Sequence, residues 1–208
     1  ELGAFGLVHG ADTAAAVIAG PDLRGVILSG GPMSVLEEGA YGLDPAILEL
    51  GVPVLGVCYG HQLLARDLGG RLHRSESREY GKATLSVLDE ESLLFRGMDH
   101  SQVVWMSHGD HVEEAPEGFV ATARSGGVPV AAMEDRQRRR YGIQFHPEVT
   151  HTPHGTSLLL NFLHDCGMKL DWNAGNFIDE QVAAIRARVG AGRVVLVVRF
   201  YESSPRKR

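Results

Sequence analysis

The chain of 208 residues has few cysteines, no excess of positive charge and no long apolar run. Its two cysteines, Cys58 and Cys166, are too few for a disulfide framework, so we expect a reducing, cytoplasmic compartment. The formal net charge of -6 would not attract nucleic acid or an anionic membrane, and neither is expected as a partner. No apolar segment approaches the roughly 20 residues that cross a bilayer. A small-molecule substrate is the remaining expectation.

The composition is that of a globular domain, with 44% hydrophobic and 22% charged residues. In the first seventy residues strand-like and helix-like segments alternate, which is typical of βαβ units on a parallel sheet. Apolar residues fill both faces of the expected strand 52–57, so it should lie in mid-sheet between two helical layers. Strands are expected at 5–9, 25–29 and 52–57, and helices at 11–19, 44–50 and 61–68.

From about Tyr80 to Phe145 the pattern changes to strands joined by turns, which predicts antiparallel pairs. These strands are expected at 82–88, 103–106, 119–123, 128–133 and 141–145. Two helices follow, at 156–166 and 178–189, each ending at a glycine and separated by a linker over 168–176. An arginine cluster at 136–140 lies between two strands and favours a solvated turn over an anion-binding patch.

The most informative segment is Gly56-Val57-Cys58-Tyr59-Gly60, between an apolar strand and a helix. It has the pattern of a nucleophile elbow, in which flanking glycines avoid collisions around a strained turn. At the N-terminus of the following helix, the dipole and free N–H groups should lower the pKa of the Cys58 thiol. We therefore expect Cys58 to be the nucleophile, whereas Cys166 should be a small buried residue.

A thiol that attacks a carboxamide needs a base and a group that orients the base. His146-Pro147-Glu148 offers both, because residues two apart at a strand end point to the same side. His151 and His154 follow nearby, but the intervening prolines break any regular spacing, so no metal site is predicted. The sequence thus predicts a Cys58, His146 and Glu148 triad.

The tetrahedral intermediate of such a reaction needs backbone donors for its oxyanion. A glycine-rich turn, Ser29-Gly30-Gly31-Pro32, follows the expected strand 25–29 and can supply one donor. The N–H of Tyr59, directly after the nucleophile, can supply the second.

These three motifs, in this order and approximate spacing, resemble the class I, or triad, glutamine amidotransferases. Glu79-Tyr80-Gly81, Trp105-Met106-Ser107-His108-Gly109-Asp110 and the segment 146–152 make the chain most similar to the glutaminase domain of GMP synthetase. The resemblance implies a flavodoxin-like α/β fold with a mostly parallel central sheet, flanking helices and an added antiparallel portion. It also implies that glutamine is hydrolysed to glutamate and ammonia.

Carried onto this sequence, the resemblance implies Cys58, His146 and Glu148 as the triad and Gly31 and Tyr59 as backbone oxyanion donors. It implies substrate contacts from Gln62 and from a loop formed by Ser107, His108 and Gly109. A turn at 79–81 and the loop at 107–110 are the candidate contacts with a partner domain.

The resemblance also predicts a domain division, with the amidotransferase domain at 1–168 and a linker plus the start of an ATP pyrophosphatase domain at 169–208. The family's first strand would lie before Glu1, and its nucleotide-binding loop does not follow the expected strand 193–198. No cofactor is therefore expected in this chain, and ATP and Mg²⁺ would belong to the synthetase domain, acting in cis or in trans. The polar, basic tail at 203–208 is expected to be disordered.

The expected role is ammonia supply for the conversion of xanthosine monophosphate to GMP. Two alternatives stay open from the sequence. One is a stand-alone cysteine hydrolase of γ-glutamyl substrates, and the other is a non-catalytic interaction remnant.

Overall fold

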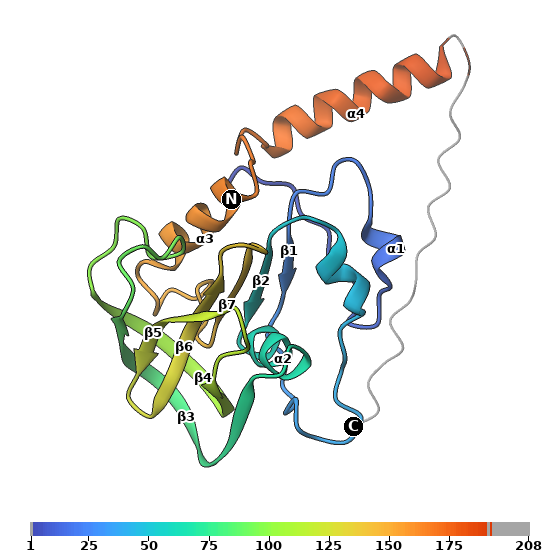
Figure 1. Cartoon of the computed structure of the whole chain (residues 1–208). Coiled ribbons are helices and arrows are strands. Elements are labelled where there is room, and N and C mark those ends of the chain that lie inside the picture. The colour runs from blue at the N-terminus through green and yellow to red at the C-terminus, as the bar shows by residue number, and fades with distance from the viewer. Residues whose placement is uncertain (1, 191, 193–208) are drawn as a thin grey trace, which may run out of the picture.

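A computed structural model describes residues 2–190 and 192, so the expected strand 193–198 and the tail 203–208 lie outside the described residues. Figure 1 shows a sheet with helices on either side and a long final helix that extends away from it. The elements in chain order are α1 (Ala15–Ile18), β1 (Val26–Leu28), the 3-10 helix η1 (Pro45–Glu49), β2 (Val54–Val57), α2 (Tyr59–Asp67), β3 (Arg71–Val87), β4 (Ser101–Glu114), β5 (Val120–Ser125), β6 (Val128–Asp135), β7 (Arg140–Ile143), α3 (Gly155–Asp165) and α4 (Ala174–Val189).

The strands form one mixed sheet of seven in the order β1-β2-β7-β6-β5-β3-β4. The parallel portion is β1-β2-β7, with Val54 opposite Val26 on one side and Arg140 on the other. The remaining neighbours pair antiparallel, as predicted for the second half of the chain. This places β2 inside the sheet, as expected, one strand from its edge. The carboxyl ends of β2 and β7 lead directly into Cys58 and the His146 segment.

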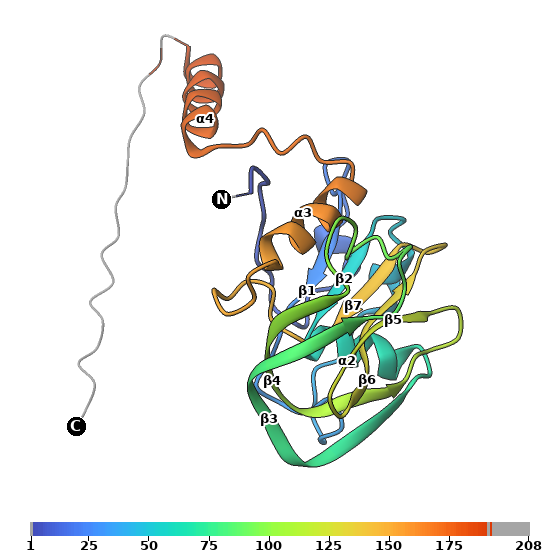
Figure 2. The same cartoon turned by 90° about the vertical axis from the view of Figure 1, so that its left-hand side faces the viewer.

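Strand β2 is buried along its whole length because helices cover both faces of the sheet. Val54 packs in one core cluster with Leu64 and Ala65 of α2. Leu55 faces the other way, into a larger cluster with Phe162 of α3. Figures 1 and 2 show α2 and α3 on opposite sides of the parallel strands. The continuous apolar run of this strand therefore has the two-sided burial that the sequence predicted.

Three sequence predictions in the N-terminal part differ from the structure. Residues 5–9 form no strand, and Phe5, Leu7 and Val8 are 50%, 71% and 100% exposed. A short apolar segment forms a strand only where a neighbour supplies its hydrogen bonds, and no described strand lies beside this one. The helix expected at 11–19 shrinks to the four residues of α1, and the helix expected at 44–50 is the short 3-10 helix η1.

The largest correction concerns the ribbon formed by β3 and β4, which are 17 and 14 residues long. The turn predicted at 79–81 lies inside β3, and the loop predicted for Ser107, His108 and Gly109 lies inside β4. The two segments pair with each other, with Glu79 opposite His108. Polar residues mid-strand resembled turns in the sequence, but the ribbon's alternating burial keeps every second residue on the core side.

The C-terminal helices lie close to where they were predicted. Helix α3 ends before Gly167, whose φ of +70° suits glycine, and α4 starts at Ala174, shortening the linker. Among the described residues, no helix has the length and apolar character needed to span a membrane. The arginine cluster forms a turn as predicted, but its side chains pair with carboxylates rather than with solvent alone, namely Arg136 with Asp89, Arg138 with Asp135, Arg139 with Asp165 and Arg140 with Glu49.

Candidate active site

Cys58 occupies the sharp turn between β2 and α2, as the elbow pattern predicted. Its backbone has φ +50° and ψ −101°, a conformation that costs free energy for a residue with a Cβ atom. Two hydrogen bonds hold it there, from Cys58 N–H to the Ile143 carbonyl at 2.8 Å and from Gln62 N–H to the Cys58 carbonyl at 3.1 Å. The surrounding fold therefore imposes the strained conformation that presents the thiol.

The glycines on either side of Cys58 are required by close backbone contacts. A Cβ on Gly56 would lie 2.4 Å from the Gly60 carbonyl oxygen, and a Cβ on Gly60 would lie 2.1 Å from the Leu28 carbonyl oxygen. Both distances are well inside van der Waals contact, so any larger residue would force β1 and α2 apart. The expected purpose of the two glycines is confirmed.

The electrostatics of Cys58 differ from the sequence prediction. Burial raises the pKa of the Cys58 thiol to about 11, and this outweighs the lowering effect of the hydrogen bond from the Tyr59 N–H. The negative charge of Glu148 raises the pKa further, whereas the Gln144 side chain, with its amide nitrogen 3.7 Å from Sγ, lowers it. The prediction of a lowered pKa was wrong because Cys58 is only 5% exposed, so desolvation of the thiolate exceeds the effect of the hydrogen bonds that favour it.

His146 and Glu148 follow β7 and contact each other as predicted. His146 Nδ1 lies 2.8 Å from Glu148 Oε1, which is a short, well-formed hydrogen bond. The imidazole is 19% exposed and the Glu148 side chain 57% exposed, so this pair lies at the surface end of the site. In the tautomer that donates from Nδ1 to the carboxylate, Nε2 is left as an acceptor.

Cys58 and the His146 imidazole meet at Gly30, in the glycine-rich turn after β1. A Cβ placed on Gly30 would lie 3.2 Å from His146 Cε1 and 3.6 Å from Cys58 Cβ. Any side chain at this position would enter the space between the two groups. Three segments far apart in the sequence, at 30, 58 and 146, thus converge on one point.

A cavity of about 430 Å³ opens beside Cys58, a volume typical of small-molecule sites. Most of the predicted site residues line it, namely Gly31, Cys58, Tyr59, Gln62, Ser107, His108 and Gly109. Gly31 lies against the Tyr59 ring, and a Cβ added to this glycine would lie 3.4 Å from Tyr59 Cγ. Arg74 and Glu37 also line the cavity and form an exposed ion pair, with 3.5 Å between Nη2 and Oε1.

The inner wall of this cavity is a network that the sequence did not fully reveal. Gln62 Nε2 donates to the Asp110 carbonyl at 2.6 Å and to Gln144 Oε1 at 3.1 Å, so this amide nitrogen is occupied by internal partners. The Asp110 carboxylate accepts from the Ser34 hydroxyl, and Asp110 is buried within strand β4 and not in the predicted loop. Gln144 was missed, although a lone polar residue in the apolar strand pattern 141–145 was the available signal.

His108 and Glu79 form a pair across the ribbon, with His108 Nε2 3.3 Å from Glu79 Oε2. Burial lowers the pKa of His108 to about 4 and raises the pKa of Glu79. Both shifts disfavour the charged forms, so we assign this contact as a weakly coupled pair rather than a strong ion pair. Within the described residues, neither ring nitrogen of His108 has a hydrogen bond of good geometry.

Cys166 has the structural role that the sequence suggested. It is 7% exposed, lies in the core cluster with Phe162 and has its pKa raised to about 12, mainly by burial. Within residues 2–190 and 192, no group of three His, Cys, Asp or Glu residues has the arrangement of a metal site.

Comparison with known proteins places this geometry in a family. The model of the family "Glutamine amidotransferase class-I" matches residues 2–166, which include the elbow, the cavity and the His146 and Glu148 pair. The chain belongs to the class I glutamine amidotransferases. Its glutamine amidotransferase domain is homologous to the glutamine-hydrolysing part of GMP synthases.

Two curated relatives are glutamine-hydrolysing GMP synthases. The one from Heliobacterium modesticaldum is 54% identical over 173 residues, covering 83% of this chain and 34% of the relative. The one from Geobacillus kaustophilus is 49% identical over 196 residues, covering 94% of this chain and 38% of the relative. The amidotransferase chain thus spans little more than a third of the length of these relatives.

Solved structures agree on the fold. A candidate GMP synthase component from Thermoplasma acidophilum superposes with a TM-score of 0.64 at 27% identity, covering 83% of this chain and 82% of that one. A glutamine amidotransferase from Thermotoga maritima has a TM-score of 0.59 at 22% identity, covering 70% and 78%. The second match supports the fold alone.

Proposed function

We propose that this amidotransferase hydrolyses glutamine through a triad of Cys58, His146 and Glu148. The observation that carries the proposal is the convergence of a strained, cavity-facing cysteine and an imidazole on Gly30, with a carboxylate hydrogen-bonded to that imidazole. Cysteine, base and orienting group are the three parts that thiol-based acyl transfer requires.

In the first half-reaction, His146 Nε2 takes the Cys58 proton as Sγ attacks the side-chain carbonyl carbon of glutamine. The C–N bond then breaks, and the departing nitrogen takes that proton from His146 and leaves as ammonia. In the second half-reaction, water attacks the thioester while His146 accepts a proton from it. The C–S bond then breaks, Sγ takes that proton back from His146, and glutamate leaves. The Glu148 carboxylate orients the imidazole and stabilises its charged form in both halves.

The high pKa of the free Cys58 thiol gives this scheme a specific requirement. The thiolate has to form by proton transfer to His146, because a thiol with this pKa is scarcely ionised at neutral pH without a base. The Tyr59 N–H, which already stabilises negative charge on the sulfur, and the Gly31 N–H at the cavity wall are the proposed oxyanion donors.

Substrate binding is assigned to the part of the cavity wall beside the nucleophile. Gln62, Ser107, His108 and Gly109 line it together with Cys58, and the volume of about 430 Å³ accommodates one amino acid with bound water. Since the Gln62 amide nitrogen is held by Asp110 and Gln144, we assign it the role of shaping the wall around the substrate. Residues 107–109 would contact the substrate from within strand β4 and not from a loop.

We propose further that the ammonia serves the amination of xanthosine monophosphate to GMP. The support is the identity of about half of all residues with glutamine-hydrolysing GMP synthases across most of this chain. In this scheme the partner is an ATP pyrophosphatase domain, in cis or in trans, and ATP and Mg²⁺ bind to that domain.

The test is glutaminase activity of the chain with and without a pyrophosphatase domain loaded with its nucleotides. We expect glutamate and ammonia from wild type, and no activity above background from Cys58→Ala. Cys166→Ala is the matched control, because it removes the other buried thiol from outside the cavity. Cleavage of γ-glutamyl peptides in preference to free glutamine would instead favour a stand-alone hydrolase, and a folded chain with no turnover under either condition would favour an interaction module.

A further inference from the structure

A closed set of hydrogen bonds holds the backbone of His146 against strand β4, and its centre is the Thr152 hydroxyl. Thr152 Oγ1 accepts from the Trp105 N–H at 3.1 Å and donates to the His146 carbonyl at 2.7 Å. The His146 N–H in turn donates to the Trp105 carbonyl at 3.1 Å. The Thr152 hydroxyl therefore bridges the Trp105 N–H and the His146 carbonyl, which do not bond to each other.

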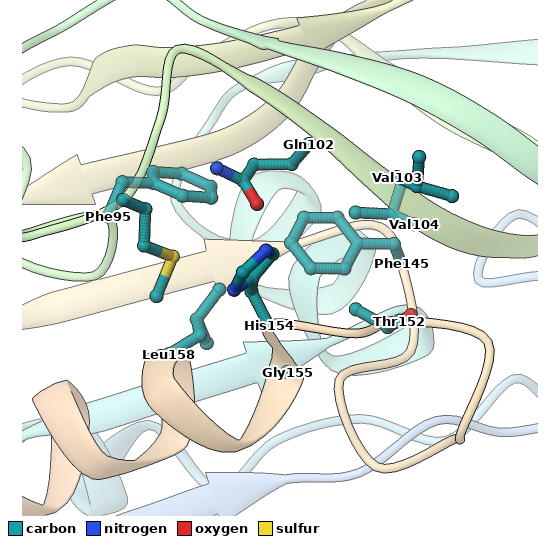
Figure 3. Close-up of a pocket in the computed structure, with 10 residues that line it drawn as sticks. Phe95, Gln102, Val103, Val104, Phe145, Thr152, His154, Gly155 and Leu158 are labelled. Atoms are coloured by element: carbon teal, nitrogen blue, oxygen red, sulfur yellow. The ribbon is translucent and has the colours of Figure 1, made fainter.

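The loop that carries Glu148 is folded tightly around this hydroxyl. A Cβ on Gly155 would lie 1.9 Å from the Pro147 carbonyl oxygen, so the two ends of the loop touch. The rings of Trp105 and His151 have their centroids 4.5 Å apart. Figure 3 shows Thr152 beside Phe145, the residue that precedes His146, at the wall of a small cavity that Val104 also lines. Thr152 is itself only 6% exposed, so water is a poor substitute for its hydroxyl.

Strand β4 also contacts the nucleophile, through Ser107, two residues after Trp105. Cys58 Sγ lies 3.6 Å from the Ser107 carbonyl oxygen, in donor geometry. Strand β4 thus holds the sulfur through Ser107 and the backbone of the base through Trp105. The separation of thiol and imidazole depends on both contacts, and Thr152 completes the second one.

We propose that Thr152 is a positioning residue for the triad, acting through its hydroxyl to fix His146 relative to Cys58. The proposal rests on the function proposed above, because it requires that His146 act on the Cys58 thiol. It predicts that the hydroxyl, and not the volume or methyl group of Thr152, determines the chemical step.

Three substitutions separate these contributions. Thr152→Val keeps the shape but leaves the Trp105 N–H and the His146 carbonyl without their partner. Thr152→Ser keeps the hydroxyl and loses the methyl group. Thr122→Val is the matched control, because Thr122 is fully buried and its Oγ1 has no hydrogen-bond partner among the described residues.

For glutaminase activity, we expect Thr152→Val to lower kcat by roughly tenfold to a hundredfold, with KM changed less than about threefold, since small misplacements of a catalytic group act on the chemical step. Thr152→Ser and Thr122→Val should stay within about threefold of wild type. Thermal unfolding of each variant establishes that the assayed protein is folded.

A second readout does not depend on glutamine turnover. The rate of Cys58 alkylation by iodoacetamide is measured in wild type and in each Thr152 or Thr122 variant, and again in the same protein carrying His146→Asn. The ratio of the rate with His146 to the rate with His146→Asn reports how strongly the imidazole acts on the thiol. We expect this ratio to fall toward one in Thr152→Val and to be retained in Thr152→Ser and Thr122→Val.

Distinct results would overturn the two proposals. A wild-type ratio well above one that is unchanged in folded Thr152→Val, or a Thr152→Ser variant as impaired as Thr152→Val, would refute the positioning role while leaving the proposed function intact. A wild-type ratio of one, together with no glutaminase activity, would instead refute the proposed triad and with it the role of Thr152.

Discussion

We predict that acid destabilises the folded protein, because the imidazole of His61, near the start of the elbow helix, is buried. His61 is fully buried, its Nε2 lies 3.0 Å from the Val130 carbonyl oxygen, and Gly142 packs against its ring. Burial lowers the pKa of His61 from 6.5 to about 4, and the contact with Val130 offsets only part of that effect. The folded protein therefore holds this imidazole neutral under conditions in which an unfolded chain would protonate it.

The sign and size of the effect follow from proton linkage. Between pH 6.5 and about pH 4 the unfolded state binds a proton that the folded state does not, so stability is retained above this window and lost as the pH falls through it. Each pH unit within the window is worth about 1.4 kcal/mol. Acidification from pH 7 to pH 5 should therefore cost about 2 kcal/mol from this residue alone, and the lowered pKa of His108 adds a loss in the same direction.

Urea unfolding at pH 7 and pH 5 measures this loss, which corresponds to a midpoint shift of roughly 1 M at the urea sensitivity of a domain of this size. His61→Gln keeps an amide donor for the Val130 carbonyl but cannot titrate, and it should remove most of the His61 contribution. His100→Gln, at a side chain that is 71% exposed, is the control for the same exchange of an imidazole for an amide outside the core. An unaltered pH dependence in a folded His61→Gln variant would refute the linkage argument.

Two further predictions concern the elbow and the triad. Glu148→Gln should lower kcat/KM by roughly tenfold to a thousandfold in steady-state assays, because it weakens the orientation of His146. The variant should remain folded, since the Glu148 side chain is 57% exposed. Full activity would exclude an orienting role. Gly60→Ala should lower the free energy of unfolding, measured by urea denaturation, by at least about 2 kcal/mol, because the added Cβ would overlap the Leu28 carbonyl. Gly42→Ala is the control and should be nearly neutral, because a Cβ at Gly42 has open space around it.

Much of the site could be predicted from the sequence because its chemistry depends on short, local patterns. The glycines around Cys58 lie two residues on either side of it, so their spacing alone indicated the elbow, although the contact that requires Gly60 comes from Leu28 of the neighbouring strand β1. The pairing of His146 with Glu148 is also local, since the two lie two positions apart along the chain.

The remainder depended on contacts between segments distant in sequence. Residues 107–110 resembled a loop until their pairing with β3 was known, and the Asp110 carboxylate is buried because Ser34 reaches it from 76 residues away. The pKa of Cys58 was misjudged for the same reason, since the helix terminus is visible in sequence but the desolvation is not. The role proposed for Thr152 likewise arises from a strand 47 residues away.

The central claim, that Cys58 is a nucleophile activated inside the glutamine cavity, is tested most directly by covalent labelling. A glutamine analogue that carries a diazoketone in place of the carboxamide should be incubated with the folded chain, and the modified residue identified by mass spectrometry. We expect a single adduct at Cys58, slowed by excess glutamine and by His146→Asn, with Cys166 unmodified because it is buried in the core away from the cavity. Labelling of both cysteines at similar rates, or no adduct at Cys58 in folded protein, would contradict the account.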